Sequence, residues 1–253
     1  MSIVKRKILS LEVDSGKYSD FIVKIISLAA NKKSSYVCVS NVHMTIEAYD
    51  DKAFANCVNG ADLVTPDGMP LVKAMKLLYG IKSERVAGMD LMPSILEIAE
   101  KEQISIFFYG GTQSMLDKTA VYLKNNYPDI KAVSFFSPPF RALEENEKIE
   151  IVNRINESQA SIVFVVLGCP KQERWMAENK GKINACMIGV GGALPVIIGE
   201  QKRAPMWMQR ASLEWFYRFC QEPRRLFKRY FYTNTKFLLL LFIALIKKAF
   251  GKA

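Results

Sequence analysis

Five short apolar runs alternate with longer mixed segments through the first 190 residues, and this alternation constrains the fold more than any other feature. The runs are YVCV at 36–39, ADLVT at 61–65, SIFFY at 105–109, SIVFVVL at 161–167 and ACMIGV at 185–190. Continuous apolar runs are typical of strands buried on both faces, and intervening helices make such strands parallel. We therefore predict an α/β fold with a mainly parallel, Rossmann-like sheet and flanking helices.

The segments between the runs have the spacing of helices. Apolar residues recur at helical intervals in residues 90–101, 112–126 and 143–157, and Asp90 and Thr112 are suited to cap the first two segments. The alternation stops near Gly199. With 253 residues, half of them apolar, the chain is long enough for one large core and an appendage. We predict an α/β body at 1–199 and a helical appendage at 200–253.

All of the excess positive charge lies in the last 53 residues, within the predicted appendage. From Gln201 onward there are twelve basic and two acidic residues, so of the 35 basic and 25 acidic residues of the chain, 23 of each lie in the first 200 residues. The segment RAPMWMQRASLEWFYRFCQEPRRLFKRYFY predicts two basic amphipathic helices separated at Pro223. The apolar run at 237–246 would span only ~15 Å of a ~30 Å hydrocarbon layer as a helix. We expect peripheral attachment to an anionic membrane surface.

The cysteines and the N-terminal segment indicate a cytoplasmic location. Five cysteines include no CxxC pair and mostly lie in apolar stretches, which is typical of packed thiols in a reducing compartment. The segment MSIVKRKILSLEV has no uninterrupted apolar region after its charges, as an export signal would need. We therefore expect a cytoplasmic protein, peripheral on the inner face of the cell membrane.

Ligands of open α/β sheets collect beyond the carboxyl ends of the strands, so the residues after each apolar run are the candidates for chemistry. In Thr65-Pro66-Asp67-Gly68 the proline and glycine favour a sharp turn that can direct the Asp67 carboxylate into a crevice as a general base. The same carboxylate equally suits a cap for a helix beginning near Gly68. Spacing alone favours neither interpretation.

A polar cluster follows the most apolar run. Lys171, Gln172 and Glu173 come within one turn of its end, and Pro170 can start a helix whose amides face the crevice. The alternative is a plain turn followed by a solvated helix face. The density of polar residues so close to a strand end favours a site.

Paired glycines after another run are a weaker signal. Gly110 and Gly111 would let backbone amides approach a phosphate, although two glycines after a strand more often form only a tight turn. The glycines at 189–192 lack the full GxGxxG spacing. We therefore predict no nicotinamide cofactor.

Three further polar residues complete the candidates. Asn41 offers amide hydrogen bonds for sugar hydroxyls, and His43, the only histidine, more often has a structural role than a catalytic one. Arg85 is a bidentate donor, although a surface ion pair is the commoner role of such a residue.

Six motifs occur in a fixed order: TPDGMP, ERVAGMDL, FYGG, FFSPPF, VLGCPKQERW and RAPMWMQRASLEWFYR. Together they resemble the WecG/TagA/CpsF glycosyltransferases, from about Asn41 to Tyr230. The resemblance implies an α/β enzyme that transfers a sugar from a UDP-sugar to a polyprenyl-diphosphate-linked sugar on the cytoplasmic membrane face, with inversion at the anomeric carbon. N-acetylmannosamine is the sugar to which it points. A related hexose or uronic acid, and teichoic acid, capsule, enterobacterial-type antigen or exopolysaccharide synthesis, stay open.

The resemblance also implies roles for individual residues. Asp67 matches the aspartate that deprotonates the acceptor hydroxyl, and Asn41, Arg85 and Gln172 match positions expected to hold the donor or the acceptor. Met89 stands where a small polar residue is expected. Basic residues of the appendage would close over the diphosphate, with four candidates: Arg218, Arg224, Arg225 and Arg229.

We predict that the reaction uses no metal and no cofactor. The chain contains no DxD motif, with which many glycosyltransferases hold a divalent cation. Arginines, the amides of Gly110 and Gly111 and a helix N-terminus would instead stabilise the charge that develops on UDP.

Two other interpretations compete with the enzyme on a lipid acceptor. In the first, a non-enzymatic binding module, the basic aromatic tail holds nucleic acid or acidic lipid and the body is only a platform. Such a module would not need Asp67, Arg85 and Gln172 beside a crevice of a neutral body, so we expect no nucleic-acid partner. In the second, a nucleotide-sugar enzyme acting on a soluble substrate, the tail has no explanation. The oligomeric state stays open, and a homo-oligomer is compatible with the sequence.

Overall fold

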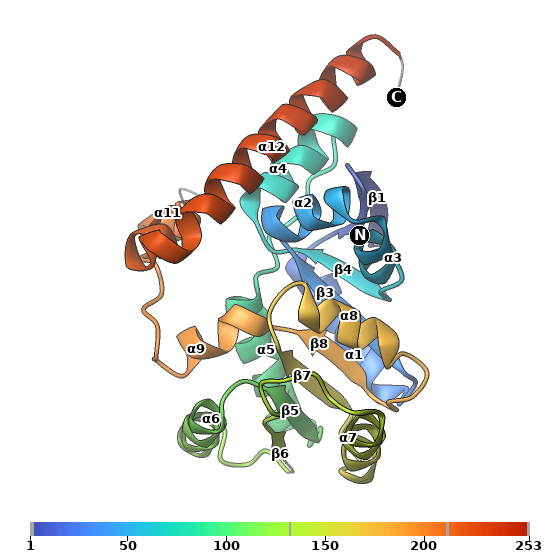
Figure 1. The fold of residues 1–253 in the computed structure, drawn as a ribbon, viewed down its shortest axis with the longest axis vertical. Coiled ribbons are helices and arrows are strands. Elements are labelled where there is room, and N and C mark those ends of the chain that lie inside the picture. The colour runs from blue at the N-terminus through green and yellow to red at the C-terminus, as the bar shows by residue number, and fades with distance from the viewer. Residues whose placement is uncertain (1–2, 132, 211–212, 252–253) are drawn as a thin grey trace.

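The computed structural model describes residues 3–131, 133–210 and 213–251. Its centre is a six-stranded sheet in the order β4-β3-β8-β7-β5-β6, in which every neighbouring pair is parallel (Figure 1). The predicted α/β fold is confirmed. The strands are β3 (Ser35–Ser40), β4 (Leu63–Pro66), β5 (Ile106–Gly110), β6 (Val133–Phe136), β7 (Ile162–Val166) and β8 (Cys186–Gly189).

Helices cover both faces of the sheet, and this explains the apolar runs. Along β5, Phe107 and Tyr109 belong to one hydrophobic core, whereas Ile106 and Phe108 belong to the core on the opposite face. The first core packs against α2 (Val42–Asp50), α3 (Lys52–Asn59), α7 (Glu145–Glu157) and α8 (Lys171–Glu178). The second packs against α1 (Tyr18–Ala30), α5 (Gly88–Lys101), α6 (Gln113–Asn126) and α9 (Leu194–Ile197), which follows the short 3₁₀ turn Gly191–Ala193.

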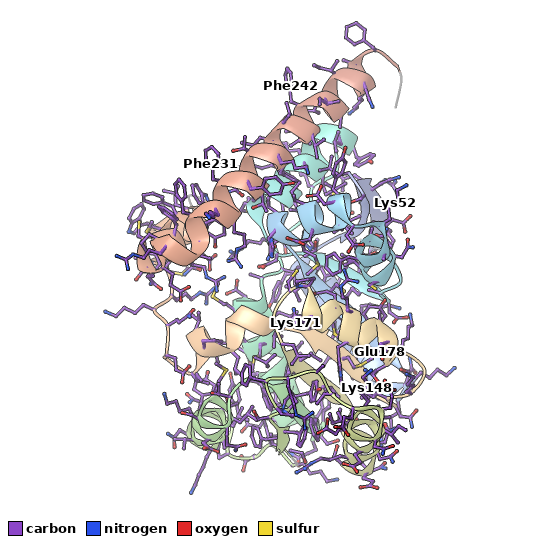
Figure 2. The ribbon with its side chains drawn as sticks, viewed as in Figure 1. Lys52, Lys148, Lys171, Glu178, Phe231 and Phe242 are labelled. Atoms are coloured by element: carbon purple, nitrogen blue, oxygen red, sulfur yellow. The ribbon has the colours of Figure 1, made fainter. Side chains whose placement is uncertain are left out.

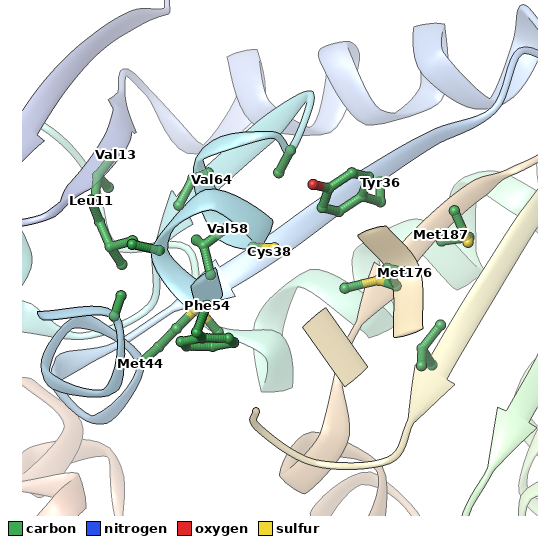
Figure 3. Close-up of a cluster of buried hydrophobic side chains, with 14 of the residues drawn as sticks. Leu11, Val13, Tyr36, Cys38, Met44, Phe54, Val58, Val64, Met176 and Met187 are labelled. Atoms are coloured by element: carbon green, nitrogen blue, oxygen red, sulfur yellow. The ribbon is translucent and has the colours of Figure 1, made fainter. Parts of the chain in front are cut away.

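The sequence analysis missed three strands. One is the edge strand β6, and the others form the antiparallel hairpin of β1 (Val4–Ile8) and β2 (Leu11–Ser15). Leu11 and Val13 of the hairpin are fully buried in the first core, near Val64 of β4 (Figure 3). The hairpin therefore extends this core beyond the edge of the main sheet.

The two predicted helix caps had different outcomes. Thr112 caps α6 as expected, because its hydroxyl accepts a hydrogen bond from the Met115 N–H at 3.2 Å. The cap predicted at Asp90 is wrong: α5 begins at Gly88 and Ala87 occupies the N-cap position. The Asp90 carboxylate instead pairs with Arg85 and Arg203.

The chain beyond the sheet is helical. It forms α10 (Met206–Arg210), α11 (Glu214–Gln221) and α12 (Pro223–Ala249). The predicted break at Pro223 is confirmed, but two helices, α10 and α11, precede it where one was predicted. The 27-residue α12 runs along α2 and along α4 (Met69–Tyr79) (Figure 1). Phe237 of α12 is only 1% exposed and joins the first core. The division into domains at residue 199 stays a prediction.

One face of α12 packs on the body and another is exposed. Tyr232 Oη donates to Asp50 at 2.8 Å, and Lys236 pairs with the same carboxylate. Phe231 and Phe242 are 68% and 61% exposed and point away from the body (Figure 2). Within the described residues, the segment Leu226–Ala249 is long and apolar enough to cross a membrane, by length and composition alone. The helix is therefore longer than the apolar run at 237–246 on which the sequence estimate rested.

Candidate active site

A pocket of about 470 Å³ lies at the carboxyl ends of the central strands, under α11 and α12. The strands that end there are β3, β4, β7 and β8, as expected for a parallel α/β sheet. The pocket brings together six of the predicted site residues: Asn41, Asp67, Arg85, Gln172, Arg218 and Arg229. Sequence positions separated by up to 188 residues therefore share one cavity.

Asp67 directly follows β4 and is held by its backbone. Its N–H donates to the Ser40 carbonyl at 2.7 Å, and the preceding Pro66 carbonyl accepts from the Val86 N–H at 2.9 Å. Gly68 occupies the N-cap position of α4, so Asp67 does not cap that helix. Its carboxyl instead lines the pocket, which is where a general base must lie to reach a substrate.

The surroundings of Asp67 change its proton affinity. Desolvation raises its pKa to about 6, and the nearby Glu214 carboxylate acts in the same direction. Arg85, Arg218 and a hydrogen bond with Asn41 oppose the rise in pKa. A carboxyl with this pKa is ionised at neutral pH and is a stronger base than an ordinary aspartate.

The side-chain oxygen of Asn41 has a structural role, and its amide faces Asp67. Its Oδ1 caps α2 by accepting from the Met44 N–H at 3.1 Å, a role that the sequence analysis did not assign. This bond fixes the side-chain amide of Asn41 beside Asp67, whose carboxylate accepts a hydrogen bond from that amide. The predicted contact of Asn41 with a sugar hydroxyl stays a prediction.

Gln172 lies at the start of α8 and is 5% exposed. Its Oε1 accepts from the Gly168 N–H at 3.2 Å, and its Nε2 donates to Glu173 Oε1 at 2.8 Å. A Cβ at Gly189 would lie 2.8 Å from Nε2, and one at Gly191 would lie 2.9 Å from Oε1. The glycines that follow β8 thus make room for this side chain, a purpose the sequence analysis missed.

The four candidate arginines do not all lie in the pocket. Arg218 and Arg229 line the pocket, and Arg218 Nη2 donates to the Gly192 carbonyl at 3.3 Å. Arg224 is exposed and lies outside the pocket lining. Arg225 belongs to α12, but its side chain lies outside the part of the chain that the structure describes.

Arg85 is engaged at both ends of its guanidinium. Its Nη1 donates to Glu214 Oε2 at 2.5 Å and its Nη2 to Asp90 Oδ2 at 3.0 Å. Glu214 also lines the pocket, and the sequence analysis did not single it out. Its position as one of only two acidic residues from Gln201 onward was the available signal.

Gly110 and Gly111 lie at the end of β5, outside the pocket lining. The Gly111 N–H donates to the Val166 carbonyl at 2.9 Å and is therefore occupied. A Cβ at Gly110 would lie 2.6 Å from the same carbonyl oxygen, and both residues have φ values, +103° and +76°, that favour glycine. The tight-turn interpretation accounts for both glycines.

His43 lines the pocket beside the appendage. Desolvation, aided by the charge of Arg229, lowers its pKa to about 4, so the imidazole is neutral at physiological pH. The positive charge of the site therefore comes from arginines. Within the described residues, no group of three or more His, Cys, Asp or Glu side chains is arranged to hold a metal ion.

The sequence model of the Glycosyl transferase WecG/TagA/CpsF family matches residues 6–250. The chain belongs to this family. A relative from Staphylococcus aureus (strain MW2) is 28% identical over 225 residues, which cover 88% of this chain and 87% of the relative. A relative from Bacillus spizizenii is 29% identical over 194 residues, 76% of this chain and 74% of the relative. Both are named N-acetylglucosaminyldiphosphoundecaprenol N-acetyl-beta-D-mannosaminyltransferase.

Family membership confirms the resemblance noted in the six sequence motifs. The match covers nearly the whole chain and includes both the sheet and the helices that close the pocket. The prediction of a glycosyltransferase is likewise confirmed.

Proposed function

We propose that the chain transfers N-acetylmannosamine, or a closely related sugar, from a UDP-sugar to a polyprenyl-diphosphate-linked N-acetylglucosamine. The observation that carries the proposal is the basic carboxylate of Asp67 in a pocket that arginines of the appendage close. The names of the two relatives support this sugar and this acceptor. The product would enter a bacterial cell-surface polysaccharide, such as teichoic acid, capsule or exopolysaccharide.

In the proposed reaction Asp67 acts as general base. The acceptor hydroxyl gives its proton to the carboxylate as its oxygen forms a bond to the anomeric carbon of the donor. The bond from that carbon to the diphosphate breaks at the same time, and UDP leaves with the electron pair. Because attack and departure occur on opposite faces, the anomeric configuration inverts.

Arg218 and Arg229 are suited to stabilise the departing diphosphate. Their guanidinium groups line the same pocket as Asp67, and arginine binds phosphate oxygens with paired, charge-assisted hydrogen bonds. We therefore propose that transfer proceeds without a metal ion. Addition of EDTA should leave the rate unchanged, and a rate that collapsed and returned with magnesium would contradict this part of the proposal.

We further propose that the enzyme works as a peripheral protein on the inner face of the cell membrane. The exposed side of α12 carries aromatic and aliphatic side chains such as Phe227, Phe231 and Phe242, and basic residues lie along the same appendage. Apolar insertion and attraction to anionic lipids add in such a segment. An acceptor with its lipid chain in the bilayer would then meet the pocket at the membrane surface.

The product mass tests the proposed function. The full-length protein would be incubated, without metal, with a panel of UDP-sugars and a short-chain N-acetylglucosamine-diphosphate-lipid. We expect one added N-acetylhexosamine from UDP-N-acetylmannosamine, lost in Asp67→Ala and retained in Asp117→Asn, which changes an exposed aspartate of α6. Absence of any product with every donor would contradict the proposed substrates.

A further inference from the structure

Glu214 is an acidic side chain in a pocket whose other appendage groups include two arginines. It is the first residue of α11, and its side chain is 14% exposed. One carboxylate oxygen accepts the 2.5 Å bond from Arg85, and the other, Oε1, is buried and has no hydrogen-bond partner among the described residues. The general-base mechanism gives this buried carboxylate no role.

Glu214 belongs to a series of ion pairs that connects the appendage to the body. It pairs with Arg85, Arg85 pairs with Asp90 at 3.0 Å, and Asp90 pairs with Arg203. The first and last residues of this series of ion pairs, Glu214 and Arg203, lie after residue 199, whereas the two central residues, Arg85 and Asp90, lie in the body. Partly buried pairs are screened by salt much less than exposed ones.

The packing of α11 explains why these pairs matter. None of its eight residues is buried, and Trp215 and Phe216 are exposed. The aromatic side chains Trp215 and Phe219 contact Tyr230 and Phe227 of α12, so no buried apolar side chain fixes α11 to the body itself. Glu214 and Arg218 are four residues apart and lie on one face of α11. Glu214, at the start of the helix, contacts Arg85, and Arg218, about one turn later, contacts the Gly192 carbonyl.

We propose that Glu214 is a positioning residue that acts through Arg85 and holds α11 over the pocket, so that Arg218 stands across from Asp67. The ionic contact ties α11 to the body, whereas the aromatic contacts of this helix are with α12. The contribution of the closed pocket to catalysis rests on the proposed function. The placement of α11 itself does not, and it can be tested without activity.

Hydrogen exchange of the α11 amides in the full-length protein tests the placement. We expect Glu214→Gln to accelerate exchange in α11 about fivefold, because a charge-assisted hydrogen bond becomes a neutral one. The matched control is Glu222→Gln, which removes another acidic charge of the appendage, outside the pocket lining. Equal exchange of α11 in the wild type and Glu214→Gln would overturn the proposal, whatever the activity.

The pH dependence of transfer gives a readout that a merely structural role would not move. Desolvation is the main cause of the raised pKa of Asp67, and among its neighbours only Glu214 adds to the rise, whereas Arg85, Arg218 and the Asn41 amide lower the pKa. Removing the Glu214 charge leaves desolvation and the three neighbours that lower the pKa. The acid limb of kcat/KM should therefore move to lower pH in Glu214→Gln and stay in place in Glu222→Gln. A limb that stays in place in Glu214→Gln would contradict the placement of Glu214 beside the base.

Discussion

The two walls of the pocket are built differently. On the body side, Asn41, Asp67 and Gln172 follow strands and are fixed by hydrogen bonds with neighbouring backbone groups. On the appendage side, Glu214 and Arg218 project from a helix with no buried residue. The body wall is therefore preorganised by the sheet, whereas the part of the appendage wall that α11 forms is tied to the body by a few polar contacts. Substitutions of Asn41, Asp67 or Gln172 should therefore leave the closure of the pocket unchanged, whereas substitutions of Glu214 or Arg218 should alter it.

The largest effect should come from the preorganised wall. We expect Asp67→Asn to lower kcat about 10²- to 10⁴-fold, the usual contribution of a general base, with little change in KM. Steady-state kinetics on the lipid-linked acceptor would measure it. A decrease of less than tenfold in a folded variant would assign the base to another residue.

The same variant should be more stable than the wild type. Folding raises the pKa of Asp67 from 3.8 to about 6, so above pH 6 its ionisation costs the folded state about 3 kcal/mol, at about 1.4 kcal/mol per unit. That cost decreases as the pH falls from 6 toward 3.8. We expect a higher melting temperature for Asp67→Asn at neutral pH and a smaller difference at pH 5. An equal or lower melting temperature at neutral pH would contradict the desolvation of this carboxyl.

The two faces of α12 allow a sharper comparison within the appendage. Phe237→Ala should lower the free energy of unfolding by about 3–5 kcal/mol, because Phe237 is buried in the core of the body. Phe231→Ala, on the exposed face of the same helix, should change it by less than about 0.5 kcal/mol. Denaturant unfolding would measure both. Similar losses of unfolding free energy in the two variants would show that both faces of α12 contribute equally to stability.

Only Phe231→Ala should then weaken cosedimentation with anionic vesicles while the protein remains folded. The apolar contribution to membrane binding comes from side chains that face away from the body (Figure 2). Unchanged sedimentation in this variant would indicate that the membrane contact lies elsewhere.

The arginines provide the next test of the appendage wall. We expect Arg218→Ala to lower kcat/KM about 10²-fold, a typical cost of losing one donor that stabilises developing charge. Arg224→Ala, which removes an exposed guanidinium outside the pocket, should have a much smaller effect. Equal losses in the two variants would mean that net charge matters more than position.

Much of this architecture could be predicted from the sequence because burial on both faces leaves a strong pattern. The five apolar runs became β3, β4, β5, β7 and β8. The edge strand β6, which is only partly buried, and the β1–β2 hairpin, whose strands mix charged with apolar residues, lack a continuous buried apolar run and were missed. Asp90 was mistaken for a cap because helical spacing does not show that its carboxylate pairs with Arg85, five residues before it, and with Arg203, 113 residues after it.

The candidate site was predictable where it follows strand ends and less so where it depends on the appendage. The turn after β4 placed Asp67 correctly in a crevice. By contrast, helical spacing alone could not distinguish Arg218 and Arg229, which line the pocket, from the exposed Arg224. Nor could it reveal that Glu214 reaches Arg85, because that contact depends on how α11 is placed on the body.

The pH dependence of wild-type kcat/KM most directly tests the central claim that Asp67 is the base of a site formed by both walls. Transfer requires the ionised carboxylate, and desolvation raises its pKa to about 6. We predict that kcat/KM is level above pH 7 and falls about tenfold per pH unit below about 6. A profile that stayed level down to pH 4.5, in a protein still folded there, would contradict the claim.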